Sequence, residues 1–186
     1  VDHLEELAGC CAIGHVRYST TGSSILTNAQ PFIVRHRNKM YAVGHNGNIV
    51  NAHALKEELE QAGSIFQSTM DSEIFLHLFV KNLKLGFEQA LVASVSRLEG
   101  AFSFVMLTNR GEVVGIRDPH GFRPLCLGRH DGNYVLASES CALDLVEADE
   151  LSFDVSTLTG ESVPADGGVG DPAHAGPFLS GGSGVG

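Results

Sequence analysis

A glycine between two asparagines, Asn46-Gly47-Asn48, follows the apolar-leaning run Met40-Tyr41-Ala42-Val43 closely. A β-strand that ends in such a turn can aim a backbone N–H and an Asn amide at one point. Donors arranged in this way form an oxyanion hole, which stabilises the negative charge that develops on an attacked carbonyl. Asn-Gly is also a strongly favoured hairpin turn. This segment alone therefore allows both a catalytic and a purely structural interpretation.

Five further segments carry polar and charged residues in a distinctive order. They are Gly14-His15-Val16-Arg17-Tyr18-Ser19-Thr20-Thr21-Gly22, Ala29-Gln30-Pro31-Phe32, Thr69-Met70-Asp71-Ser72-Glu73, Arg117-Asp118-Pro119-His120-Gly121-Phe122-Arg123-Pro124-Leu125 and Ala137-Ser138-Glu139-Ser140-Cys141-Ala142-Leu143. Together, from about residue 7 to residue 146, they resemble the glutaminase domain of the amidophosphoribosyltransferase family, a class II glutamine amidotransferase of the N-terminal-nucleophile hydrolase type. The glutaminase domain of glucosamine-6-phosphate synthase shares the layout. However, the segment equivalent to Arg17-Tyr18-Ser19-Thr20 reads Arg-Trp-Ala-Thr there, which favours the amidophosphoribosyltransferase family.

The resemblance implies a role for five residues of this chain. Arg17 would bind the α-carboxylate of glutamine through its planar fork, assisted by the hydroxyl of Thr20. Asp71 would pair with the α-ammonium group. Asn46 and the N–H of Gly47 would form the oxyanion hole, where one lost donor typically costs about 10²–10³ in rate.

Structural explanations remain open for these positions. Arg17 can be a surface residue of a strand, and Asp71 can be a first-turn acid favoured by the helix dipole. His15 and His45 are expected to be supporting residues, since the family mechanism needs no imidazole base. A structural network of ion pairs and turns is expected for Arg117, Asp118 and Arg123, with Pro119 and Pro124 fixing the backbone.

The family's nucleophile is a Cys at the first position of the mature chain, with its own α-amino group as the base. This sequence begins with Val1, so the segment carrying that Cys is expected upstream, and the chain as given is expected not to hydrolyse glutamine. Cys10 and Cys11 lie just before Arg17 on an expected core strand. Both are therefore expected to be buried structural cysteines rather than nucleophiles.

The family reaction transfers the amide nitrogen of glutamine to phosphoribosyl pyrophosphate, giving 5-phosphoribosylamine, glutamate and pyrophosphate, in the first committed step of de novo purine biosynthesis. The resemblance implies glutamine as a ligand, no cofactor or metal in this fragment, Mg²⁺ in a missing phosphoribosyltransferase domain, and a homo-oligomer for the full-length enzyme. An alternative from a different class is a catalytically inactive domain that binds glutamine or acts as an interaction module.

Charge and composition exclude several classes of protein. Residues 1–129 contain 12 acidic and 12 basic side chains, whereas residues 130–186 contain 10 acidic and none that are basic. Without a basic patch, nucleic acid is not an expected partner. No run approaches the ~18 apolar residues of a membrane span, so no membrane partner is expected. Four cysteines without metal-ligand spacing suggest a reducing, cytoplasmic location.

The predicted elements run from strands to helices and back to strands, which indicates an α+β fold. With the resemblance, this implies a four-layer αββα sandwich of two antiparallel sheets, incomplete at the N-terminus. A hairpin link is expected at Arg37-Asn38, and Asn51 is expected to cap a helix. Strands are expected at residues 12–18, 32–36, 40–45, 101–108, 112–117, 125–127 and 134–137, and helices at residues 52–62, 71–83, 86–98 and 141–147.

A change in composition divides the chain into a truncated glutamine amidotransferase type 2 domain, residues 1–150, and a Gly/Pro-rich tail, residues 151–186. This tail is expected to be disordered or a fusion scar. Within it, Thr159-Gly160-Glu161-Ser162 and its surroundings resemble the actuator loop of P-type cation-transporting ATPases. The resemblance would give Glu161 a role in hydrolysing an aspartyl phosphate, but the sequence shows no other pump motif.

Overall fold

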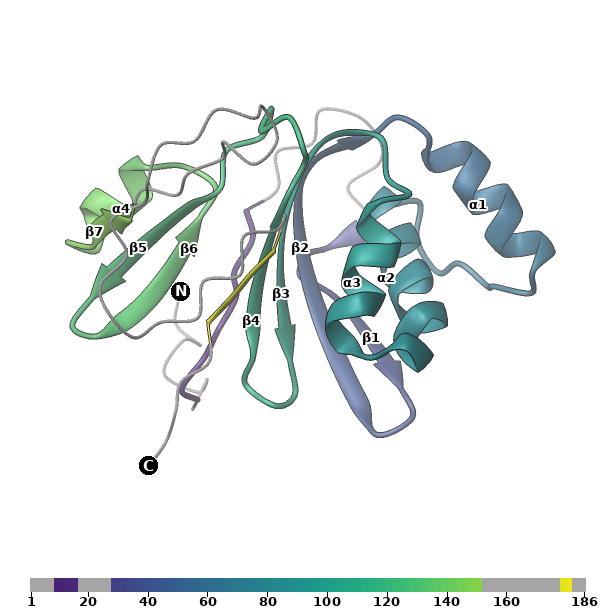
Figure 1. Ribbon diagram of the computed structural model, residues 1–186, viewed down its shortest axis with the longest axis horizontal. Helices are drawn as coiled ribbons and strands as arrows, with labels where there is room; N and C mark the ends of the chain where they lie inside the picture. Colours follow the sequence, from purple (N-terminus) through teal and green to yellow (C-terminus); the bar gives the residue numbers. More distant parts are fainter. Residues whose placement is uncertain (1–8, 17–27, 152–177, 182–186) are drawn as a thin grey trace.

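Two antiparallel sheets and the helices that cover them make up the fold (Figure 1). The computed structural model describes residues 9–16, 28–151 and 178–181, the last group by its backbone alone. The elements are β1 (Phe32–His36), β2 (Lys39–Ile49), α1 (Ala52–Gln61), α2 (Asp71–Asn82), a 3₁₀ turn (Leu83–Leu85), α3 (Phe87–Val95), β3 (Gly100–Thr108), β4 (Val113–Arg117), β5 (Cys126–His130), β6 (Asn133–Ala137), α4 (Cys141–Leu145), β7 (Asp149–Leu151) and β8 (Phe178–Gly181).

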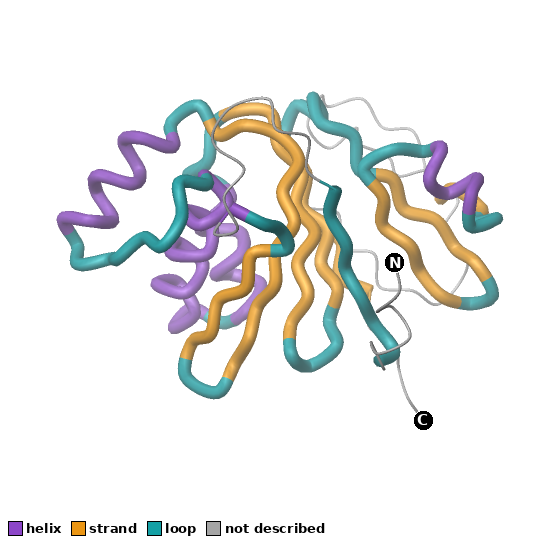
Figure 2. Tube along the Cα trace, turned by 180° about the vertical axis from the view of Figure 1, so that it is seen from behind, coloured by secondary structure: helices purple, strands orange, loops and turns teal. Residues whose placement is uncertain are grey.

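The larger sheet has the strand order β1-β2-β3-β4-β8, and its strands pair antiparallel. Helices α2 and α3 lie on one face of this sheet, and α1 packs against α2 to the side of the sheet (Figures 1 and 2). The core on this face combines aliphatic and aromatic side chains, and α2 presents an apolar stripe to it. Its fully buried aromatic side chains are Tyr41, Phe75, Phe79, Phe102 and Phe104.

The smaller sheet, with the order β6-β5-β7, packs on the other face of the larger one. Gly115 in β4 lies between two buried neighbours, Val114 and Ile116, which face the helices. A Cβ on Gly115 would point the opposite way and come within 3.1 Å of Leu125 and Leu136. The second sheet therefore packs against the first at a point where β4 lacks a side chain. Helix α4 covers the smaller sheet, and the order of layers confirms the predicted α+β sandwich.

The structure corrects the prediction that a turn follows His45. Strand β2 continues through Asn46 and Gly47 to Ile49, and pairs with β3 over nine of its eleven residues, from Tyr41↔Thr108 to Ile49↔Gly100. Gly47 has a φ of +140°, a backbone conformation that favours glycine. An added Cβ would collide with the carbonyl oxygen of Ala101 on β3. The glycine thus allows β2 to lie close to β3, and it forms no hairpin turn.

Most other predicted elements are confirmed, including the hairpin link at Arg37-Asn38 and all four helices. The helix cap is wrong: the Asn51 side chain makes no cap, but donates to the carbonyl of Arg97 and accepts from the N–H of Glu99. The strand expected at residues 12–18 is not found over residues 12–16. That segment crosses the sheet, with Cys11 at the β3–β4 turn and His15 beside Gly44.

The predicted role of Glu161 and the predicted division of the chain at residue 150 fall wholly or mainly outside the described residues. Both stay predictions. Among the helices that the structure describes, none is long and apolar enough to span a membrane.

Candidate active site

The carboxylate of Asp71 joins the start of α2 to strand β2. Its Oδ1 lies 3.0 Å from Nδ1 of His45, and its Oδ2 accepts the backbone N–H of Ile49 at 3.0 Å. These two partners lie immediately before and two residues beyond Asn46-Gly47. The structure therefore brings Asp71 beside the predicted oxyanion hole, although 24 residues separate it from Gly47.

The surroundings of Asp71 keep its carboxyl group ionised. Burial alone raises the pKa, but hydrogen bonds from His45 and from the N–H groups of Ile49 and Ser72 outweigh burial, and the pKa lies below the ordinary value of 3.8. Because the side chain retains 24% of its exposure, part of the carboxylate faces solvent. An anion that is held in place and still accessible can pair with an ammonium group.

Asn46 and Gly47 lie in β2, and both are partly exposed. Gly47 pairs with Phe102 and Asn46 with Ser103 on β3. Close pairing of β2 with β3 fixes the backbone here, and both Gly47 and Gly100 have φ values, +140° and +135°, that favour glycine. A rigid backbone is what a preorganised donor pair requires.

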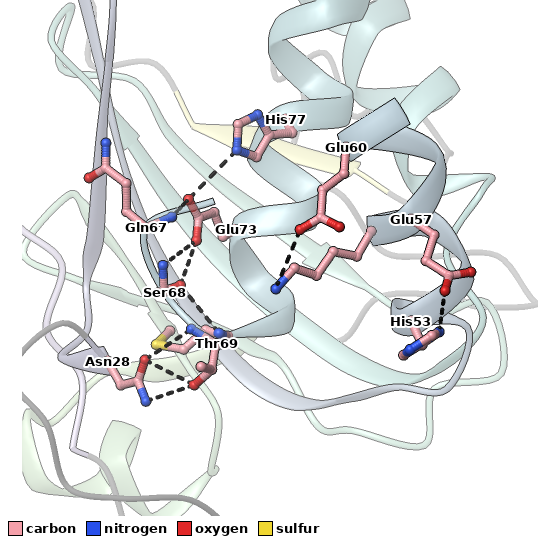
Figure 3. A network of polar contacts seen from close by, with 11 residues as sticks. Asn28, His53, Glu57, Glu60, Gln67, Ser68, Thr69, Glu73 and His77 are labelled. Carbon is pink, nitrogen blue, oxygen red and sulfur yellow. Dashed lines mark hydrogen bonds and ion pairs between the residues drawn. The ribbon is translucent and has the colours of Figure 1, made fainter. Parts of the chain in front are cut away.

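A buried carboxylate holds the loop that leads into Asp71 (Figure 3). Glu73 is 2% exposed and accepts the N–H groups of Gln67 and Ser68 and the Ser68 hydroxyl, at 2.7–2.8 Å. Asn28 adds a second tie, because its side chain bonds both the hydroxyl and the N–H of Thr69. The position of Asp71 is thus set from both sides of the loop.

Asp118 organises a second turn near the predicted oxyanion hole. Its buried carboxylate accepts the N–H groups of His120, Phe122 and Arg123 in its own turn, and that of Phe102 on β3. Burial raises its pKa, but these four hydrogen bonds outweigh burial and lower the pKa below 3.8. Since Phe102 pairs with Gly47, this turn anchors the strand against which Gly47 lies.

The Arg117 side chain acts on the backbone of that segment as well. Arg117 donates to the carbonyl oxygens of Gly121 and Arg123. The predicted network is therefore present as a turn, held by bonds from side chains to backbone rather than by the expected ion pairs.

Two predicted ligands of the substrate, Arg17 and Thr20, lie outside the described residues. The prediction of burial for the adjacent cysteines is wrong: Cys10 is exposed and Cys11 is only partly buried. The Cys11 thiol donates to the carbonyl of Gly111, in the turn between β3 and β4. A hydrogen bond to Cys10, followed by burial, raises the pKa of Cys11. A raised pKa disfavours the thiolate, which agrees with the prediction that Cys11 is no nucleophile.

Sequence reasoning gave no role to several residues that build the site. Gln30 accepts the backbone N–H of His45 at 2.6 Å, while Asn28 and Glu73 hold the loop before Asp71. All three lie within or beside the motif segments, so their position was the available signal. Their partners were not predictable, because each contact depends on how distant elements pack.

Comparisons with known proteins agree with this fold. A glutamine amidotransferase domain model matches residues 15–145. The solved glutamine phosphoribosylpyrophosphate amidotransferase from B. subtilis superposes with a TM-score of 0.68 at 41% identity, over 74% of this chain and 29% of that one. The fold is therefore that of a class II glutamine amidotransferase, with two antiparallel sheets between helices.

The chain belongs to the glutamine amidotransferase domain family. It is 46% identical over 164 residues to amidophosphoribosyltransferase 2 of Arabidopsis thaliana, a chloroplastic enzyme, over 88% of this chain and 28% of that protein. It is 41% identical over 150 residues to the amidophosphoribosyltransferase of Staphylococcus aureus, over 80% of this chain and 30% of that protein. The chain thus spans less than a third of the length of these relatives.

Proposed function

We propose that this domain binds glutamine and stabilises the oxyanion that forms when the side-chain amide of glutamine is attacked. One observation carries the proposal: the Asp71 carboxylate is bonded directly to the two residues, His45 and Ile49, that flank the segment Asn46-Gly47-Asn48 on β2. An anion for the α-ammonium group and donors for the amide oxygen therefore belong to one site.

Each group has a defined task in this proposal. Asp71, ionised and partly exposed, pairs with the α-ammonium group. The planar fork of Arg17 binds the α-carboxylate, with Thr20 beside it. Asn46 and the N–H of Gly47 donate to the amide oxygen as it gains negative charge, an interaction that strengthens in the transition state. The attacking thiolate and its base are not assigned to any residue of this chain.

The released ammonia is proposed to pass to phosphoribosyl pyrophosphate in an amidophosphoribosyltransferase of which this domain is a part. The relatives of Arabidopsis and Staphylococcus, both named amidophosphoribosyltransferases, support this step. Their phosphoribosyltransferase part, with its expected Mg²⁺, and their assembly into homo-oligomers belong to the same proposal. The cytoplasmic location also stays a prediction, since some relatives are chloroplastic.

Calorimetric titration of the 186-residue chain with glutamine tests the proposal. The wild-type chain is expected to bind glutamine with 1:1 stoichiometry. The Asp71→Asn variant is expected to bind at least about tenfold more weakly, since a bond to a charged group contributes about 1.5–3 kcal/mol. An exposed carboxylate on another helix, Glu57, provides the matched control, and Glu57→Gln should leave the affinity unchanged. Equal affinity of the Asp71→Asn variant and the wild-type chain would contradict the proposal.

A further inference from the structure

His45 contacts the carboxylate on which the proposed amino-acid site depends. Its Nδ1 lies 3.0 Å from Oδ1 of Asp71, and its side chain is only 3% exposed. The second carboxylate oxygen is taken by the N–H of Ile49. Two contacts from β2 thus fix the plane of the carboxylate. Since an ionised carboxylate offers about four acceptor positions, capacity remains for a ligand.

The imidazole ring of His45 is itself held in one orientation. It stacks on Phe104 with ring centroids 4.4 Å apart and an interplanar angle of 24°. Its backbone N–H donates to Gln30 Oε1 at 2.6 Å, which fixes the main chain at the same residue. Stacking on Phe104 and the fixed main chain together hold the ring so that Nδ1 faces Asp71.

The chemistry of the pair determines where the proton lies. An ionised carboxylate accepts hydrogen bonds and cannot donate, so Nδ1 must carry the proton. Nε2 is buried and has no hydrogen-bond partner among the described residues. The hydrogen bond from Nδ1 therefore orients the carboxylate, and the acceptor positions that it leaves open stay available to a ligand.

We propose that His45 is a positioning residue for the recognition of the α-ammonium group. It donates from Nδ1 to Oδ1 of Asp71 and so turns the carboxylate toward the ligand. This inference rests on the proposed binding of glutamine. If His45 served only to fill the core beside Phe104, its replacement would alter stability but not the selection of an ammonium group.

Two variants separate positioning from packing. In Asn, the amide nitrogen is attached to Cγ, as Nδ1 is in His, so His45→Asn keeps a donor near the required place. In Gln, the amide nitrogen lies one bond further out and corresponds to Nε2. His45→Gln therefore fills the cavity but loses the donor to Asp71.

Calorimetry with two ligands measures the effect on the ammonium group alone. Glutamine and glutaramate, which is glutamine without its α-amino group, are titrated into each form of the 186-residue chain. The preference of the wild-type chain for glutamine should fall by about tenfold or more in His45→Gln and stay within about threefold in His45→Asn. Affinity for glutaramate should change little in either variant.

The possible outcomes separate the two proposals. A wild-type chain without preference for glutamine over glutaramate would overturn the proposed function, and this inference with it. A preference retained in full by His45→Gln would overturn the role of His45 alone. If a variant fails to fold, ¹⁵N NMR of the wild-type imidazole decides, with the His45 ring assigned through its couplings to the assigned backbone. A pyrrole-like Nδ1 supports the inference, and a pyridine-like Nδ1 overturns it.

Discussion

Replacing Gly47 with alanine tests how the fold builds the oxyanion hole. At this residue β2 lies so close to its partner β3 that an added Cβ would collide with the Ala101 carbonyl and lie 2.7 Å from Cα of Phe102. Both obstacles are backbone atoms, which cannot move aside without separating the strands. Gly47 also has a φ of +140°, which L-residues rarely adopt.

These two effects set the expected loss of stability for Gly47→Ala. A residue with a side chain in such a backbone conformation costs about 1–3 kcal/mol. Inserting a methyl group into a filled space costs about 1–3 kcal/mol more. The sum of about 2–6 kcal/mol is a large share of the 5–15 kcal/mol by which a domain is typically stable. Strand separation should also weaken glutamine binding, because it displaces Asn46 and the Gly47 N–H.

Urea denaturation followed by circular dichroism provides the measurement. The matched control is Gly63→Ala at the end of α1, where φ is +87° but no atom lies within 4 Å of the added Cβ. That control carries the conformational cost without the collision. Gly47→Ala is therefore expected to lose about 1–3 kcal/mol more than Gly63→Ala, at a similar slope with urea. Equal losses in the two variants would refute the claim that β3 leaves no room for a side chain at Gly47.

Three further predictions concern the groups around the site. Glu73→Gln should destabilise the chain by at least about 2 kcal/mol in urea denaturation, because the buried N–H and hydroxyl groups of Ser68, and the N–H of Gln67, lose a charged acceptor; an unchanged midpoint would contradict this. Asp118→Asn should cost most stability above pH 3.8 and progressively less as pH falls below it, since a lowered pKa contributes stability only while the carboxylate is ionised; a pH-independent difference would refute the assignment. The double change Cys10→Ser and Cys11→Ser should leave glutamine affinity within about twofold in calorimetry, as expected for changes away from the site, and a larger loss would show that these thiols belong to it.

The sequence predicted best those elements whose signal is local. In α2 the apolar residues Ile74, Phe75, Leu78 and Phe79 recur at helical spacing, and all four are buried in the structure. The two-residue link at Arg37-Asn38 likewise follows from the chain between two apolar runs. Periodicity and turn chemistry need no knowledge of distant partners.

Predictions failed where a distant partner decides the local structure. Asn46-Gly47 has the sequence of a hairpin turn, but pairing with β3 keeps it within a strand. The glycine allows the two strands to lie close together there. Asn51 has the sequence of a helix cap, but its side chain bonds Arg97 and Glu99, more than 40 residues away. Tertiary contacts outweighed local preference in both cases.

The glutamine site stays a prediction, but the grouping of its residues can be compared with the structure. Asn46, Gly47 and Asp71 were chosen through a family resemblance, and the structure places Asp71 beside the other two. The contact between His45 and Asp71 could not be read from the sequence, because it depends on how the start of α2 meets β2.

A crystal structure of the 186-residue chain with bound glutamine tests the central claim most directly. The account predicts that the α-ammonium group lies within hydrogen-bond distance, about 2.7–3.2 Å, of the Asp71 carboxylate. It also predicts that the side-chain amide oxygen points toward the Asn46 amide and the Gly47 N–H. Glutamine bound elsewhere, or bound with its ammonium group turned away from Asp71, would contradict the account.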